Sequence, residues 1–579
     1  MVALFLLFAA GTAAYSNSFH MPFLFDDFYG IVNNPNLRCG VPLLKLLSGS
    51  IRPVVEITFA LNYRLGELDV RSYHAVNLLI HLLAAFTLYS LLHRTCRDRF
   101  LGFCTAAIWM LHPLQTQAVV YTIQRAECLM GLFYFLTLYS LRLSVDTPRY
   151  SRRWQGACVL CCLLGMGTKA GMITAPITAL LYDRYFLANS FREALRIRRG
   201  FYLALFGTWI AAAALNLSVE TAAQTFAQQG RAVSPLPYFL TQNQVILHYL
   251  RLSVWPRPLV FDYADWPLVH SAGKVLPELL LLTTLAAATV AAVLRRYRVG
   301  FLGAWFFLTL MPTSSFFPLP DPAFEFRMYL PLAALAGLLV FGAAARVRRQ
   351  GFTAVLLLAI AAGLGAATFV RNKDYRSRTS LSNDTAAKRP RNVRAWNNLA
   401  AALITEGKPD EALPALQRAL ALNPQSSQAN FILGQLHLQR SQWQEALSFF
   451  EKAVEAKLDF SLAHQSKGIA LEMLGRDKEA FAAYSEALRI SPELPEAHHG
   501  LGVLLARQER WREAAAEFVQ AIRYKTDYAL AYKNLGVAFT KTGVLQGAIH
   551  AYTQAVRLNP QDQESQTDLE QLLRGNNRR

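Results

Sequence analysis

Two adjacent carboxylates, Asp26 and Asp27, follow a strongly apolar opening of the chain in the stretch FHMPFLFDDFYGIVNNPNLR (19–38). A carboxylate within hydrogen-bond reach of a reacting hydroxyl can take its proton, so the pair could supply a general base. Adjacent residues of a regular element point in different directions, which predicts different jobs for the two side chains. The alternative is that both cap a helix and meet water as loop charges. The elements that position the pair therefore matter.

Three short loops between later apolar runs carry one cation each. A lone cation on a side of the membrane where cations are disfavoured suggests a function, although it can also be a snorkelling side chain. The cations are Arg125 in HPLQTQAVVYTIQRAE (112–127), Lys169 in GTKAG (167–171) and Arg327 in FFPLPDPAFEFR (316–327).

Other polar residues at the ends of apolar runs have competing interpretations. Glu127 begins an apolar run, where a carboxylate is costly unless it is paired, and the nearest candidate partner in sequence is Arg125. Residues two apart on a helix do not face each other, which weakens that pairing. Arg52 suits either a ligand or the entry of an interfacial helix, and His112 suits the polar end of a helix better than a ligand. Arg327 can contact a ligand or pair with Glu325.

Composition identifies the class of protein that must position these residues. The chain has 579 residues, of which 53% are hydrophobic and 17% charged, and its mean hydropathy is +0.22. These values are typical of a polytopic membrane protein rather than a soluble one. The net charge of +19 would suit nucleic acid, but many arginines lie in short clusters between apolar runs, as in cytoplasmic loops. We therefore expect no nucleic-acid partner. The seven cysteines show no metal spacing.

Eleven apolar runs predict a membrane bundle of about eleven spans, although several are shorter than the roughly 20 residues that a span needs. Basic loops place the N-terminus inside and residue 371 outside if 241–259 is an interfacial or re-entrant helix. The first run is expected to be a span and not a cleaved signal. The runs lie near 1–18, 73–93, 100–112, 126–145, 155–170, 171–188, 201–217, 275–294, 299–317, 328–346 and 352–370.

A strict 34-residue period begins near residue 393 and predicts a second, α-solenoid domain. Glycine holds 434, 468, 502 and 536, where the first repeat has Ala400. Small residues at a fixed period are typical of tetratricopeptide repeats, in which two helices cross closely. We expect a membrane domain over 1–371, a linker over 372–392, five repeats over 393–560 and a capping tail over 561–579. Alanine recurs at 395, 429, 463, 497 and 531, at 412, 446, 480, 514 and 548, and at 419, 453, 487, 521 and 555.

The order of motifs along the chain resembles a known family. The motifs are FLFDDFYGIVNNPNL, RPVVEITFALNY with YHAVNLLIHLL, HPLQTQAVVYTIQRAE, TKAGMITAPITALLYDRYF and FPLPDPAFEFRMYLPLAAL, followed by the repeats. This order resembles the transmembrane and tetratricopeptide-repeat O-mannosyltransferases and their bacterial and archaeal relatives. The resemblance covers nearly the whole chain and implies the C-type membrane glycosyltransferase fold, all-α, here in a prokaryotic relative.

The resemblance implies a function. It implies transfer of a sugar, with mannose as the candidate, from a polyprenyl-phosphate carrier to protein hydroxyls on the periplasmic or lumenal side. The first-loop carboxylates Asp26 and Asp27 would contact the acceptor, and the carrier phosphate would meet Arg125 and Lys169, with Arg52 and Arg327 next. His112 and Glu127 would support them. One departure concerns Lys169, because many relatives have a glutamate after that lysine, whereas here Ala170 follows.

This chemistry needs few components. Attack by the hydroxyl from the face opposite the phosphate inverts the anomeric carbon, and one carboxylate base is enough. The leaving phosphate needs positive charge, which arginine or lysine provides. No Asp-x-Asp metal clamp occurs in the sequence, so we expect no metal or other cofactor. The repeats would bind the acceptor or a partner protein in their groove.

A second function class remains open from the sequence. The chain could be a non-enzymatic scaffold for envelope assembly, in which membrane helices merely display the repeats. An anchor needs one or two spans, so eleven spans favour the enzyme. The expected location is a bacterial inner membrane with the repeats in the periplasm, or the endoplasmic reticulum membrane with lumenal repeats if the source is eukaryotic.

Overall fold

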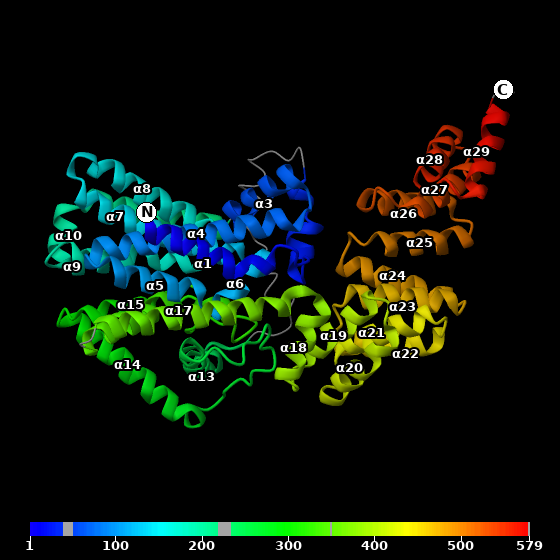
Figure 1. The fold of residues 1–579 in the computed structure, drawn as a ribbon. Helices are drawn as coiled ribbons and strands as arrows, with labels where there is room; N and C mark the ends of the chain where they lie inside the picture. Colours follow the sequence, from blue (N-terminus) through cyan, green and yellow to red (C-terminus); the bar gives the residue numbers. More distant parts are fainter. Residues whose placement is uncertain (39–49, 218–232, 348–349, 577–579) are drawn as a thin grey trace. The chain divides into compact units, whose positions relative to one another are not determined.

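The computed structural model describes residues 1–38, 50–217, 233–347 and 350–576, and over these ranges it consists of helices and connecting loops without a strand (Figure 1). The chain divides into two compact units, Met1–Ala395 and Trp396–Arg579. The expected all-α architecture is therefore confirmed for the described residues. Each unit is considered by itself below.

The first unit is a bundle of mainly apolar helices. Their ends follow local sequence signals: the Asp98 carboxylate accepts a hydrogen bond from the Leu101 amide at 2.9 Å and caps α5, while proline begins several other helices. The helices are α1 (Val2–Tyr15), α3 (Pro53–Gly66), α4 (Val70–Cys96), α5 (Arg99–Leu111), α6 (Thr116–Val120), α7 (Arg125–Asp146), α8 (Ser151–Met166), α9 (Ala175–Phe186), α10 (Phe191–Ile197), α11 (Arg199–Leu217), α13 (Pro235–Val254), α14 (Leu276–Leu294), α15 (Arg298–Leu310), α16 (Pro331–Arg346), α17 (Gln350–Asn372) and α18 (Arg378–Lys388).

Four helical stretches are long and apolar enough to cross a membrane, which indicates a membrane protein. Each predicted run overlaps a helix, but within the described ranges only these four combine the length and the hydropathy that a span needs, and an eleven-span bundle stays a prediction. The segment expected to be interfacial, 241–259, lies largely on α13. The four stretches are Val70–Cys96, Thr122–Asp146, Ala272–Leu294 and Gly351–Arg376, and the shorter apolar helices are Val2–Ser18, Arg99–Leu111, Arg298–Leu310 and Pro331–Arg346.

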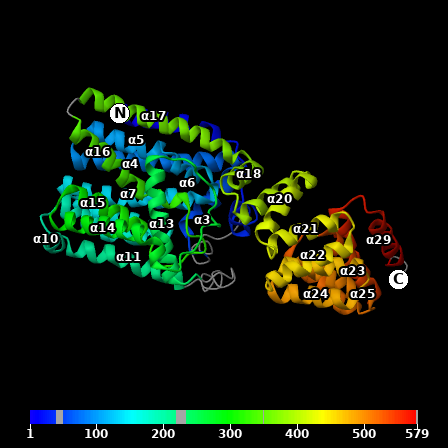
Figure 2. The same cartoon turned by 90° about the horizontal axis from the view of Figure 1, so that it is seen from below.

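The end of α1 is joined to the end of α17, which brings the aspartate loop beside the C-terminal part of the first unit. The Asn372 side-chain amide donates to the Ala14 carbonyl at 2.9 Å, and that of Asn17 donates to the Phe369 carbonyl at 2.8 Å. Along its length α17 packs on α1 and α5 (Figure 2). The segment 372–392, expected to be a linker, holds η10 (Lys373–Arg376) and α18, and it lies within the first unit.

The second unit is a stack of antiparallel helix pairs. The glycine of each later repeat faces an aromatic ring sixteen residues on, and a Cβ there would lie only 2.5–2.9 Å from a ring atom. The period of small residues therefore follows from close helix crossing, as expected for tetratricopeptide repeats. The pairs are Gly434 with Phe450, Gly468 with Tyr484, Gly502 with Phe518 and Gly536 with Tyr552.

Five helix pairs follow one another, and a final helix packs on the last pair, where the sequence predicts a cap. The helices are α19 (Val393–Thr405), α20 (Pro409–Leu422), α21 (Ser427–Gln439), α22 (Trp443–Ala456), α23 (Ser461–Met473), α24 (Asp477–Ile490), α25 (Pro495–Arg507), α26 (Trp511–Tyr524), α27 (Ala529–Lys541), α28 (Leu545–Leu558) and α29 (Gln563–Asn576).

Candidate active site

The two aspartates point in different directions. The Asp27 carboxylate is 1% exposed and accepts hydrogen bonds from two backbone amides, Leu24 at 2.8 Å and Ile123 at 2.7 Å. Asp26 is exposed, and its own backbone amide donates to the Tyr121 hydroxyl at 2.9 Å. Asp27 thus fastens the aspartate loop to the segment before α7, and this leaves the Asp26 carboxylate at the surface.

Burial dominates the electrostatics of Asp27. It raises the pKa of the Asp27 carboxyl from an ordinary 3.8 to about 8, although the two amide donors and the more distant Arg125 favour the charged form. The nearby charge of Asp26 acts in the same direction as burial. A carboxyl with this pKa in this enclosure positions a loop, whereas the exposed Asp26 carboxylate can meet a substrate.

Aromatic rings and one arginine pack around the loop that carries Asp26. Phe25 stacks on Phe261 with ring centroids 5.1 Å apart, and Tyr121 meets Phe261 edge-on at 5.3 Å. The Arg378 guanidinium, from α18, lies over the Phe25 ring at 5.4 Å and over the Phe28 ring at 5.7 Å. The site is therefore amphipathic, with apolar walls beside a carboxylate and a cation.

A buried ion pair lies farther along the same segment. Lys169 Nζ lies 2.5 Å from a Glu127 carboxylate oxygen and 3.4 Å from the Gln124 side-chain oxygen. The ammonium group also lies 4.3 Å from the centre of the Phe326 ring. Since Tyr121, Gln124 and Glu127 belong to one short stretch, this stretch connects the aspartate loop to the ion pair.

Two further cations approach Lys169. Burial lowers the pKa of Lys169, and the Glu127 carboxylate opposes this effect. The charges of Arg52 and Arg327 both lower it further, which places them in its neighbourhood. Arg52 reaches this position because it precedes α3, whose Val54 amide donates to the Gly167 carbonyl at 3.2 Å. Its side chain is exposed, so a substrate can reach it.

The side chain of Arg125 is enclosed by the protein. It was predicted to contact the donor phosphate, but its side chain is fully buried and enclosed by protein oxygens. Its Nε donates to Asn77 at 2.6 Å, and its two terminal nitrogens donate to the carbonyls of Thr58 and Tyr73 at 3.2 and 3.1 Å. The Phe59 ring covers the guanidinium at 4.4 Å. Here Arg125 joins α3, α4 and α7.

Arg327 and His112 also have partners within the protein. Arg327 donates to the carbonyls of Pro322 and Asp321, both at 2.7 Å, and so holds its own loop, with only its charge directed toward Lys169. His112 is buried and accepts a hydrogen bond from the Leu114 amide at 3.2 Å as a helix cap, as its structural interpretation predicts. Glu325 does not pair with Arg327, because its carboxylate accepts hydrogen bonds from the Val260 amide and the Tyr263 hydroxyl.

Four residues that the structure brings into the site or its surroundings had no role in the prediction. Tyr121 and Gln124 lie inside a motif that carries the family resemblance, but their types alone do not indicate chemistry. Arg378 lies in the predicted linker, where several other basic residues occur, so nothing in the sequence distinguishes it from them. Asn77, the partner of Arg125, had a usable signal, since a polar residue inside an apolar run is costly without a partner. Among the described residues, no group of three or more His, Cys, Asp or Glu could hold a metal ion.

The fold and site together define a membrane protein with a helical bundle, a surface carboxylate, a cluster of cations around Lys169, and tetratricopeptide-like repeats. Comparison with curated proteins agrees with the motif-based resemblance. Human protein O-mannosyl-transferase TMTC1 is 26% identical over 499 residues, which cover 74% of this chain and 56% of its own length. Human protein O-mannosyl-transferase TMTC3 is 23% identical over 492 residues, covering 75% and 53%. Protein O-mannosyl-transferase F38B6.6 of Caenorhabditis elegans is 25% identical over 438 residues, covering 70% and 60%.

These relatives confirm the resemblance to protein O-mannosyl-transferases of this type, and the chain spans about half to three-fifths of their length. A family model described as the cilia and flagella-associated protein 70 C-terminal domain matches residues 350–578.

Two solved structures that resemble part of the chain are tetratricopeptide-repeat proteins. YrrB, described as a repeat protein with an unusual peptide-binding site, is 21% identical and covers 33% of this chain and 97% of its own, with a TM-score of 0.29. A thermophilic repeat protein of Thermus thermophilus, TTC0263, is 22% identical and covers 31% and 99%, with a TM-score of 0.27.

Proposed function

We propose that this protein is an inverting membrane glycosyltransferase of the C-type fold that moves a sugar from a polyprenyl-phosphate carrier to a protein hydroxyl. Mannose is the sugar that the names of the relatives favour. The proposed setting is a bacterial inner membrane with the site and the repeats on the periplasmic side, or the endoplasmic reticulum lumen in a eukaryote. The repeats would bind the protein acceptor or a partner.

One observation carries the proposal: an exposed Asp26 carboxylate on a loop that the buried Asp27 holds in place. In the proposed reaction Asp26 takes the proton of the acceptor hydroxyl while the oxygen attacks the anomeric carbon. The bond from that carbon to the phosphate oxygen breaks, and its electron pair leaves with the polyprenyl phosphate. Attack and departure on opposite faces invert the anomeric carbon.

The leaving phosphate gains negative charge and needs a cation nearby. Arg52 suits this role because it is an exposed residue whose charge acts on Lys169 and Glu127. The Lys169 side chain is more than four-fifths buried and already paired with Glu127. Its charge would therefore act on the phosphate without direct contact, or it would reach the phosphate after Glu127 shifts. Arg378 lies over Phe25 beside Asp26 and would orient the sugar or the acceptor.

The test uses the purified full chain in detergent. Labelled polyprenyl-phosphate mannose is supplied with peptides that carry serine or threonine, in parallel with nucleotide-linked mannose and with added chelator. The proposal expects transfer from the lipid-linked donor alone, with an inverted anomeric centre and no effect of the chelator. If no polyprenyl-phosphate sugar yields product, the membrane-anchored scaffold becomes the better account.

A further inference from the structure

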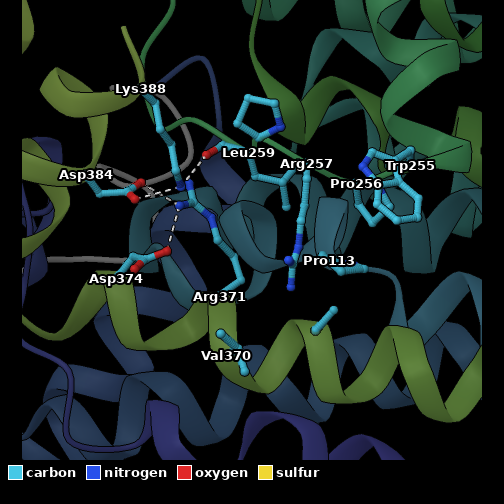
Figure 3. Close-up of a pocket in the computed structure, with 12 residues that line it drawn as sticks. Pro113, Trp255, Pro256, Arg257, Leu259, Val370, Arg371, Asp374, Asp384 and Lys388 are labelled. Carbon is cyan, nitrogen blue, oxygen red and sulfur yellow. Dashed lines mark hydrogen bonds and ion pairs between the residues drawn. The ribbon is translucent and has the colours of Figure 1, made fainter. Parts of the chain in front are cut away.

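A cavity of about 570 Å³ lies in the first unit at the end of α17, and none of its lining residues belongs to the proposed active site. Its walls come from α17, from the loop after α13 and from η10 and α18 (Figure 3). Val370 and Trp255 contribute apolar surface, while three cations and two carboxylates contribute charge. The cations are Arg257, Arg371 and Lys388, and the carboxylates are Asp374 and Asp384.

Arg371 is a buried donor that the protein does not satisfy. Its side chain is 5% exposed, and one terminal nitrogen pairs with Asp374 and with Asp384, both at 2.8 Å. The other terminal nitrogen and Nε have no hydrogen-bond partner among the described residues, and both are buried. Buried polar groups are rarely left without a partner, so two unsatisfied nitrogens of a guanidinium beside a cavity indicate that an acceptor belongs there.

The remaining charges leave the cavity cationic. Lys388 is committed to the protein, since its ammonium group lies 2.6 Å from Asp384 and donates to the Leu259 carbonyl at 3.0 Å. Arg257 is exposed, and its side chain forms no hydrogen bond or ion pair with the described residues. The lining thus has one cation more than it has carboxylates, and that cation is free to turn toward a ligand. A guanidinium with free nitrogens is well suited to bind a phosphate group.

The position of the cavity indicates where that phosphate comes from. Arg371 lies near the end of the candidate span Gly351–Arg376, where a span meets the lipid headgroups. At the same edge the side chains of Val370 and Trp255 are 56% and 67% exposed. Exposed apolar and aromatic side chains beside cations at the end of a span are typical of the membrane interface.

We propose that this cavity binds the phosphate group of an anionic membrane lipid, with Arg371 and Arg257 as its direct ligands. The site lies on α17, on the loop after α13 and on α18, so an occupying lipid would tie these three segments of the first unit together. The proposal does not depend on sugar transfer.

The test measures binding of labelled dihexanoyl phosphatidic acid to the purified full chain by equilibrium dialysis. Arg257→Gln should weaken binding about tenfold, the factor expected for one lost charge-assisted hydrogen bond. Arg371→Gln should weaken it at least as much, and Arg257→Gln keeps the test valid if the buried variant does not fold. The matched control is Arg376→Gln, which removes an exposed cation from the same end of the span outside the cavity.

Inorganic phosphate and dihexanoyl phosphatidylcholine are the competing ligands. Displacement of the lipid by millimolar inorganic phosphate would support the phosphate site and show that the free ion is enough. Resistance to phosphate, together with weak binding of the zwitterionic lipid, would support a headgroup site that also needs the acyl chains. If phosphatidic acid does not bind, or if Arg257→Gln and Arg376→Gln bind it equally, the proposal is wrong.

Discussion

Replacement of Asp27 by asparagine separates positioning from chemistry. The Asp27 carboxylate accepts two backbone hydrogen bonds, at 2.8 Å from Leu24 and 2.7 Å from Ile123. A carboxyl keeps acceptor lone pairs on both oxygens even when it is protonated, whereas the amide nitrogen of asparagine cannot accept, so in Asp27→Asn one of the two donors is left unsatisfied. An unsatisfied buried donor costs about 1–3 kcal/mol. We therefore expect the aspartate loop to detach more often, by a factor of about 10 to 100.

Hydrogen exchange of the Leu24 and Ile123 amides measures this detachment directly. Both amides should exchange faster in Asp27→Asn by about that factor, while the helices of the second unit keep their protection. Sugar transfer should fall because Asp26 spends less time in place, and donor binding should stay unchanged. Asp26→Asn is the matched control, and in this variant the Leu24 and Ile123 amides should exchange at the wild-type rate. Unchanged exchange in Asp27→Asn, together with a loss of transfer equal to that of Asp26→Asn, would refute the positioning role.

Three further predictions follow from the same contacts. Because the pKa of Asp27 is raised from 3.8 to about 8, the stability that its neutral form contributes is complete below pH 4 and is lost as the pH rises through 8. The hydrogen-exchange protection of the Leu24 and Ile123 amides should therefore fall between pH 7 and 9 by more than their intrinsic exchange rates predict. Asp27→Asn should lack this fall in protection. Glu127→Gln leaves Lys169 without its partner and should lower the free energy of unfolding by about 3–5 kcal/mol, whereas Glu127→Gln with Lys169→Met should recover most of it, as thermal denaturation would report. Arg125→Lys keeps the charge but loses at least two of its hydrogen bonds, so it should destabilise the first unit by about 3–6 kcal/mol. The molecules that fold should bind the lipid donor normally. A loss of donor binding without a loss of stability would show instead that Arg125 contacts the donor phosphate.

Local patterns predicted the parts of the molecule that depend on local physics. The 34-residue period of alanine and glycine is a packing constraint repeated in each helix pair, so it specified the second unit. The first repeat follows the same rule, because it has Ala400 where the later repeats have glycine, and Leu416, not an aromatic residue, sixteen positions on. The divergence of Asp26 and Asp27 was likewise expected from their adjacency.

Contacts between distant residues were not predictable in this way. Arg125 was placed on a phosphate because its loop carries one cation, yet its partners Asn77 and Thr58 precede it by 48 and 67 residues. Glu127 lacked a convincing partner nearby, and the one that it has, Lys169, lies 42 residues away. A single sequence shows that a buried charge needs a partner, but it does not show which distant residue the fold brings to it. The same reason hid Arg378 within an apparently polar linker and Arg371 at the edge of that linker.

The most direct test of the central claim is the rate of sugar transfer by Asp26→Asn at saturating lipid donor. Asparagine keeps the size and polarity of the side chain and removes only the proton acceptor, and Asp26 is exposed, so folding should not change. The account predicts a fall in the transfer rate of at least about 100-fold, the effect of a lost general base, with donor binding and circular dichroism equal to the wild type. A wild-type transfer rate in Asp26→Asn would contradict the account and leave the two aspartates as a cap and a loop charge.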